Sequence, residues 1–223
     1  DAVTREPDLE LLDLPDDLRA AIDEKLPPRW SRNNPIDLAG GETRDTIPEV
    51  LELAVGHPDV DAVVYLGLGI QSNQARMLRE GPFADDPDVQ RIVAYHERQD
   101  ARFAQAAHDL SVSTGKPVLT ATELAVAFPD NPGPATVRST GRLCYPSADR
   151  AVTALGHLWR HARYRIRRGL PLDGPAVGGA ALLLGLLDLV VVTEQAYAFV
   201  NGPVMVRQFT GIDVSKDELG SSA

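Results

Sequence analysis

The residues best placed to do chemistry in this chain are two glycines in the stretch VVYLGLGIQSNQARMLREG. Gly67 and Gly69 follow an apolar run that is typical of a buried strand, and a helix is expected to begin near Ser72. A helix N-terminus at the carboxyl end of a parallel strand presents free N–H groups and positive dipole to an anion. Spacing alone still favours an ordinary strand-to-helix turn, because a short Gly-x-Gly is a weak signal.

A second stretch rich in turn-forming residues is NNPIDLAGGETRDT. Pro35 favours an extended conformation at Asn34, because proline keeps the residue before it out of the α region. Asp37 can accept hydrogen bonds from nearby backbone N–H groups, and Gly40 with Gly41 permits a turn before the next helix. We interpret these residues as a structural loop.

Other reactive side chains give weaker signals. His157 and His161 have the spacing of a zinc-binding helix, but HLWRH lacks the glutamate of H-E-x-x-H, and no metal site is predicted. The single cysteine, Cys144, excludes an internal disulfide framework and fits a reducing compartment, which we expect to be the cytoplasm. Its thiol is expected to be buried and structural.

Composition narrows the functional classes. The 223 residues include 22 Lys and Arg against 32 Asp and Glu, which gives a net charge of -10. Nucleic acids and anionic membrane surfaces both require basic patches, so neither is an expected partner. The longest apolar run is too short to span a membrane, and 43% hydrophobic residues is ordinary for a globular protein.

Helix and strand signals alternate through residues 1–168. The helical signals lie at 15–26, 46–56, 87–110 and 147–167, and the strand signals lie in DAVVYL, KPVLTAT and RLCY. Continuous apolar strands between helices predict a parallel sheet covered on both faces. The predicted fold is therefore α/β, a flavodoxin-like three-layer sandwich.

A domain boundary is predicted near Gly169, where an Arg-rich stretch gives way to a Gly/Pro turn and charged residues become sparse. The predicted domains are residues 1–168 and 169–223. The second contains a small-residue helix, GGAALLLGLL, and short strands in DLVVVT and AYAFV. About fifty residues bury too little surface for an independent core, so this segment is expected to lean on other sequence.

Several motifs of the first domain occur together in one known family. They are Leu26-Pro27-Pro28, Asn34-Pro35-Ile36-Asp37-Leu38, Asp59-Val60-Asp61-Ala62 and the later segments GKPVLTATELAV and CYPSADRAVTALGHLWRHARYR. Through them, residues 8–167 resemble the third, flavodoxin-like domain in the α part of NDP-forming acyl-CoA synthetases. These enzymes are the acetate–CoA ligase relatives of succinyl-CoA synthetase.

This resemblance implies a role in phosphoryl transfer. In that family, acyl phosphate, CoA and nucleotide are coupled through a phosphorylated histidine, which two helix N-termini hold. The backbone N–H groups of Gly67, Leu68 and Gly69 then become candidate phosphate contacts. The resemblance implies coenzyme A and ATP or ADP with Mg for the complete enzyme. The CoA-binding, histidine-bearing and ATP-grasp domains are absent from this sequence, so we expect no cofactor on the chain alone, no activity alone, and an oligomeric assembly.

The tail resembles a different family. Its motifs are Gly174-Pro175, Gly178-Gly179-Ala180, Gly202-Pro203, Phe209-Thr210-Gly211 and Glu218-Leu219-Gly220. They are similar to the N-terminal half of a carboxyltransferase of biotin-dependent acyl-CoA carboxylases, a crotonase-type α/β fold. The resemblance implies acyl-CoA as a partner and biotin as the cofactor. The N–H groups of Gly178 and Gly179 would stabilise a thioester oxyanion, although the residues alone favour a closely packed small-residue helix.

Three functions are therefore open. The chain is part of an acid–thiol ligase, a fragment of a carboxyltransferase, or a non-catalytic module that docks onto partner subunits. The first accounts for the most residues, and we take it as the leading hypothesis.

Overall fold

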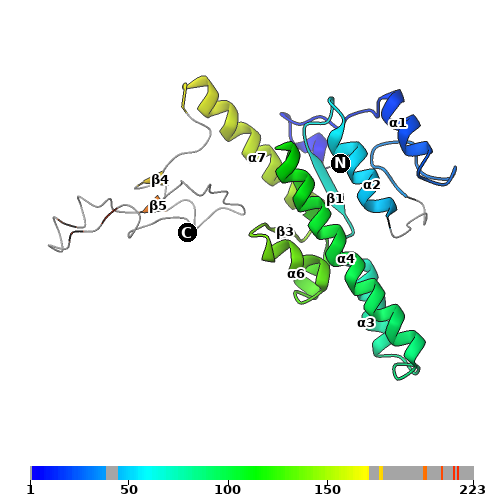
Figure 1. The fold of residues 1–223 in the computed structure, drawn as a ribbon. Coiled ribbons are helices and arrows are strands. Elements are labelled where there is room, and N and C mark those ends of the chain that lie inside the picture. Colours follow the sequence, from blue (N-terminus) through cyan, green and yellow to red (C-terminus); the bar gives the residue numbers. More distant parts are fainter. Residues whose placement is uncertain are drawn as a thin grey trace. The chain divides into compact units, whose positions relative to one another are not determined.

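A computed structural model describes residues 2–38 and 45–170, together with 176–177, 198–199 and the single residues 207, 213 and 215. The elements lie in the order η1 (Val3–Arg5), α1 (Asp16–Asp23), α2 (Thr46–Gly56), β1 (Val63–Leu66), α3 (Ile70–Arg79), α4 (Pro87–Thr114), β2 (Val118–Ala121), α5 (Leu124–Ala127), α6 (Pro132–Ser139), β3 (Cys144–Tyr145), α7 (Ala148–Arg167), β4 (Ala176–Val177) and β5 (Ala198–Phe199) (Figure 1).

Strands β1, β2 and β3 form an open parallel sheet in that order. Val63 pairs with Val118, and Thr120 pairs with Cys144. Helices α3 and α4 connect β1 to β2, and helices α5 and α6 connect β2 to β3. Parallel strands need such crossovers, because the chain must return to the starting edge of the sheet. The predicted flavodoxin-like α/β class is confirmed for this part of the chain.

Local sequence explains why α4 begins and ends where it does. The Asp86 carboxylate accepts hydrogen bonds from the N–H groups of Asp88 at 2.8 Å and Val89 at 3.3 Å, and Pro87 occupies the first helical position. Gly115, with φ +70°, ends the helix in the left-handed conformation that favours glycine.

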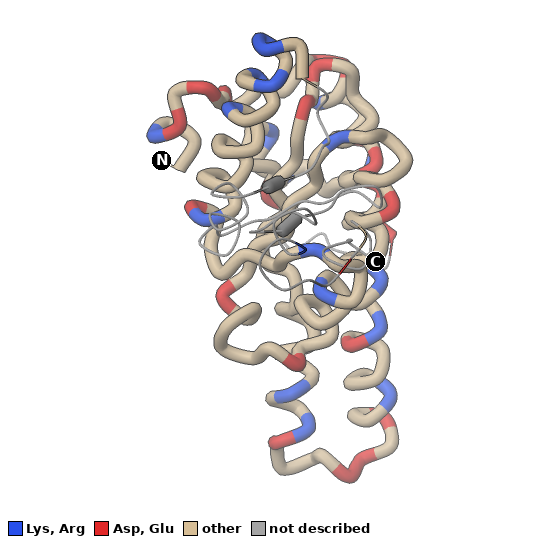
Figure 2. Tube along the Cα trace, turned by 90° about the vertical axis from the view of Figure 1, so that its left-hand side faces the viewer, with Lys and Arg blue, Asp and Glu red and all other residues tan. Residues whose placement is uncertain are grey.

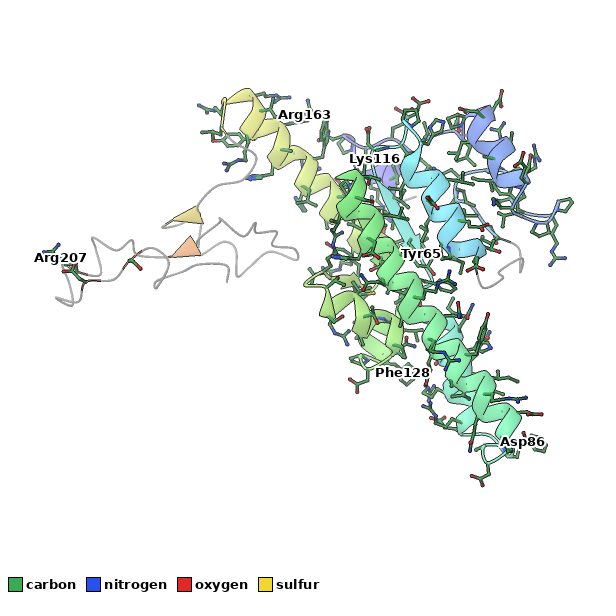
Figure 3. All side chains as sticks on the ribbon, in the orientation of Figure 1. Tyr65, Asp86, Lys116, Phe128, Arg163 and Arg207 are labelled. Atoms are coloured by element: carbon green, nitrogen blue, oxygen red, sulfur yellow. The ribbon has the colours of Figure 1, made fainter. Side chains whose placement is uncertain are left out.

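Helices α3 and α4 pack side by side as a helical hairpin that extends beyond the sheet (Figure 1). Asp86 marks the turn at its far end (Figure 3). Basic and acidic residues alternate along the hairpin (Figure 2), and one ion pair, Arg79 to Glu97 at 2.6 Å, links the two helices. Ion pairs this exposed contribute little to stability, so packing at the sheet end of the hairpin carries more of its stability.

The apolar core lies where α2, α4 and α6 meet the sheet. In one cluster of buried side chains, Leu68 and Phe103 are almost completely buried, and the other members are Ile47, Leu51, Ala104 and Val137. Successive side chains of a strand point to opposite faces. All four residues of β2 are buried, so both faces of that strand are covered.

The structure extends the sequence-based assignment in two places. Helix α3 begins at Ile70, two residues before the predicted start, and α4 continues past Leu110 to Thr114. Helices α5 and α6 were not predicted, because PDNPGP has the composition of a loop. Asn131 nevertheless caps α6 by accepting a hydrogen bond from Gly133 N–H at 3.0 Å, and Pro132 is tolerated at the first helical position.

The chain divides into two compact units of unequal length, Asp1–Thr153 and Ala154–Ala223. In the second unit, β4 and β5 pair in parallel, with Ala176 opposite Ala198. Most of the tail that resembles a carboxyltransferase lies outside the described residues, so its crotonase-like fold and the boundary near Gly169 stay predictions.

Candidate functional site

The candidate site is the turn between β1 and α3, at the carboxyl edge of the parallel sheet. Gly67 and Gly69 both have positive φ, +80° and +94°, which glycine adopts without the strain that a Cβ would add. The Gly67 N–H donates to the carbonyl oxygen of Ala121 at 3.0 Å, which ties the turn to the end of β2. Helix α3 therefore starts from a fixed point at the edge of the sheet.

A carboxylate from α4 lies at the N-terminus of α3. Asp100 accepts the Gly69 N–H on Oδ1 at 3.2 Å and the Ser72 N–H on Oδ2 at 2.5 Å. The residue is only 2% exposed. The first N–H groups of a helix have no partner within the helix, and a negative charge there is also favoured by the helix dipole. The N-terminus of α3 thus already binds an anion, which the chain itself supplies.

The surroundings of Asp100 set its ionisation. Burial raises the pKa of the Asp100 carboxyl, because the charged form loses solvation, while hydrogen bonds from Ser72 and Gly69 and the nearby His96 act in the opposite direction. The net direction is upward. The amides therefore only partly offset the cost of burying this charge.

The opposite side of the turn is held by the start of α6. Asn131 Nδ2 donates to the Gly69 carbonyl oxygen at 2.9 Å. Gly133 packs so closely that a Cβ there would lie 3.1 Å from the Gly69 nitrogen and 2.9 Å from Leu68 Cγ. A side chain at position 133 would therefore require Leu68 and the Gly69 backbone to move away from α6.

The structure gives the three predicted phosphate contacts different environments. The N–H groups of Gly67 and Gly69 donate to Ala121 and Asp100. Leu68 is fully buried, and its side chain belongs to the core. A phosphoryl group at this site would have to replace the Asp100 carboxylate, and the role of these three residues in phosphate binding stays a prediction.

Sequence reasoning missed Asp100 and Asn131, which hold the turn. Asp100 lies on the apolar face of α4, seven residues after Val93 and three before Phe103. The available signal was an acidic residue at the spacing of the apolar residues of the helix. Such a carboxylate is expected to be buried, and buried carboxylates need specific partners. The Asn-Pro pair at position 131 was a signal for a helix N-terminus.

The other predicted residues lie elsewhere. The loop of Asn34 and Pro35 is linked to the preceding segment by Asn34 Nδ2, which donates to the Leu12 carbonyl oxygen at 3.0 Å. The Asp37 N–H donates to Ser31 Oγ at 3.0 Å, and the Asp37 carbonyl accepts the Ser31 N–H at 3.2 Å. The glycine pairs Gly40-Gly41 and Gly178-Gly179 lie outside the described residues.

The described residues form neither a metal-binding cluster nor a site around a reactive thiol. No group of three His, Cys, Asp or Glu side chains there could hold a metal ion. His157 Nδ1 instead lies 3.1 Å from the Arg160 guanidinium. Burial raises the pKa of the Cys144 thiol, which favours the less reactive protonated form.

Comparisons with known proteins identify two kinds of CoA enzyme. The ligase-CoA domain family matches residues 1–71, which include β1 and the turn that follows it. This match supports a domain of the CoA-ligase type in this part of the chain. No solved structure matches the chain significantly. Among the described residues, no helix has the length and apolar character needed to cross a membrane.

A curated relative is the methylmalonyl-CoA carboxyltransferase 12S subunit of Propionibacterium freudenreichii subsp. shermanii. It is 41% identical over 51 residues, which are 23% of this chain and 10% of that subunit. The chain therefore spans only a small part of the curated relative that it matches.

The close approach of Asn131 makes Gly69 a sensitive position. In Gly69→Ala, the new Cβ would lie 2.6 Å from Asn131 Oδ1, in addition to the strain of positive φ. The control is Gly115→Ala, which has φ +70° and nothing within 4 Å. We expect the control to lose about 1 to 2 kcal/mol of unfolding free energy and Gly69→Ala to lose about 1 to 3 kcal/mol more. Equal losses in urea denaturation would contradict the close contact.

The raised pKa of Asp100 predicts a pH dependence of stability. A carboxyl whose folded-state pKa exceeds its unfolded value of 3.8 stabilises the fold fully below that value, and the contribution is lost as pH rises through the folded pKa. The unfolding free energy of the wild type should therefore fall relative to Asp100→Asn as pH rises from 3.8. Urea denaturation at several pH values measures this difference, with Asp109→Asn, exposed on the same helix, as control. If the wild type instead becomes more stable relative to Asp100→Asn as pH rises, the raised pKa of Asp100 is refuted.

Proposed function

We propose that residues 1–168 are a domain of an acid–CoA ligase of the NDP-forming acyl-CoA synthetase type. In this proposal, the N-terminus of α3 helps to hold a phosphohistidine that another domain supplies. The observation that carries the proposal is the anion already bound there, since the N–H groups of Gly69 and Ser72 hold a carboxylate at the carboxyl edge of the sheet. The ligase-CoA match, which extends through this turn, supports the enzyme class.

The chemistry of the turn suits a phosphoryl group. A phosphorylated imidazole carries negative charge on its phosphate oxygens, and fixed N–H dipoles in a buried setting stabilise such charge without reorganisation. Gly67 and Gly69 adopt the positive φ values that aim successive backbone N–H groups at the start of α3, and they do so without the strain of a Cβ. The contribution of this chain would be to bind and orient the phosphoryl group, while a side chain elsewhere forms and breaks the bond to phosphorus.

The rim of the site supports docking of a second domain. Leu66 and Ile70, which flank the turn, are 48% and 50% exposed, and Val126 in α5 is 69% exposed. Phe128 is also exposed and stacks under the Arg76 guanidinium at 4.0 Å. Exposed apolar side chains beside a polar centre, as Leu66 and Ile70 are here, are typical of protein contact sites. Coenzyme A and ATP or ADP with Mg would be held by the partner domains in this proposal.

The test is thioester formation from acid, CoA and ATP. We expect no turnover from the chain alone, and turnover when the CoA-binding, histidine-bearing and ATP-grasp domains are added. In the reconstituted complex, Gly69→Ala should lower the rate about tenfold or more, because it displaces an N–H donor, while Gly115→Ala should not. Turnover by the chain alone would contradict the proposal. Binding of the partner domains without turnover would favour the docking module.

A second function is favoured by the carboxyltransferase relative. Under that alternative, the tail would belong to a carboxyltransferase, and the N–H groups of Gly178 and Gly179 would stabilise the enolate-like charge on the thioester oxygen. The measurement is biotin-dependent decarboxylation of malonyl-CoA or methylmalonyl-CoA by the full chain. We expect no activity, because the alignment covers 10% of the relative. A signal that Gly178→Pro abolishes would favour this alternative over the ligase.

A further inference from the structure

The carboxylate of Asp100 lies at the place that the proposed function gives to a phosphoryl group. We propose that Asp100 is a built-in competitor, whose carboxylate must leave the N–H groups of Gly69 and Ser72 before an external phosphoryl group can bind them. This inference rests on the proposed function for the identity of the anion. It adds that the site in this structure is closed by the chain itself.

The geometry of the hydrogen bonds to Asp100 supports competition between its carboxylate and an external anion. Each oxygen of the carboxylate accepts a separate N–H group, at 3.2 Å from Gly69 and at 2.5 Å from Ser72. Asp100 is 2% exposed, so water does not compete strongly for these hydrogen bonds. An incoming anion needs the same two donors, and both anions cannot accept them at once.

The Ser72 hydroxyl supplies the second, independent observation. Ser72 is 4% exposed, and its Oγ has no hydrogen-bond partner of acceptable geometry. The hydroxyl nevertheless lies near enough to the Asp100 carboxyl to lower its pKa. A carboxylate presents two oxygens, which the two amides satisfy, whereas a phosphoryl group presents three. In this proposal, the Ser72 hydroxyl would donate to the third oxygen of the phosphoryl group.

Helices α3 and α4 carry further buried polar atoms without hydrogen-bond partners. Gln71 Oε1 on α3 and His96 Nδ1 and Gln99 Oε1 on α4 are buried without hydrogen-bond partners. Buried polar atoms are nearly always paired, so each unpaired atom weakens this packing. A shift of α4 that withdraws Asp100 would give these atoms a chance to find partners.

The experiment titrates inorganic phosphate into the 15N-labelled full chain at constant ionic strength and follows the amide signals of Gly69 and Ser72. The variants are Asp100→Ala, which removes the competitor, and Asp100→Asn, whose amide keeps only one acceptor oxygen. Asp109→Ala, an exposed position on the same helix, controls for the loss of charge. We expect saturable shifts in Asp100→Ala at about tenfold or more tighter affinity than in the wild type. A smaller gain is expected in Asp100→Asn, and none in Asp109→Ala.

Two results would overturn the inference: equal phosphate affinity at these amides in the wild type and the variants, or no response at these amides in the folded variants. The amide spectra report folding, and Asp100→Asn carries the test if Asp100→Ala does not fold. Phosphate binding by the variants, combined with no thioester formation in the reconstituted complex, supports the closed anion site and overturns the proposed function. Turnover in the complex, combined with no phosphate binding by the variants, supports the proposed function and overturns the closed anion site.

Discussion

The hydrogen bonds that hold the turn between β1 and α3 are the constraint on which this part of the molecule depends. Asp100 of α4 holds the turn from one side through the N–H groups of Gly69 and Ser72, and Asn131 of α6 holds it from the other through the Gly69 carbonyl. The same turn is joined to β2 by Gly67. Three elements distant in sequence are thereby fixed relative to the edge of the sheet, where ligands of parallel α/β folds bind.

This arrangement has an electrostatic cost that bears on function. Burial raises the pKa of Asp100 in spite of two charge-assisted hydrogen bonds, so the carboxylate is not a purely stabilising cap. An apolar residue would avoid the cost of desolvation but would leave two N–H groups at the start of α3 unpaired. In the proposed function, the N–H groups that now hold the Asp100 carboxylate would accept a different anion, and the exposed Leu66 and Ile70 beside the turn would contact the protein surface that supplies it.

Both comparisons concern CoA enzymes, yet they describe different reactions. The ligase-CoA match lies within residues 1–71 and includes the turn, whereas the carboxyltransferase similarity covers 51 residues and only a tenth of its relative. The turn that carries the Gly69 and Ser72 N–H donors begins within the part of the chain that the first match covers. In the proposed function, these main-chain donors would stabilise charge, and reactive groups would come from partners.

The sequence by itself determined the elements whose signals are local. Helical periodicity, proline and glycine boundaries and apolar strands located α1, α2, α4, α7 and the three strands of the sheet. The residue spacing favoured an ordinary strand-to-helix turn at Gly67–Gly69, and only the family resemblance made this turn a candidate anion site. Tertiary structure alone decided which anion lies there now. Asp100 and Asn131 are 31 and 62 positions away from Gly69, and their hydrogen bonds exist only after α4 and α6 pack against the sheet. Local patterns report propensity and burial, but a contact between distant residues follows from the path of the whole chain.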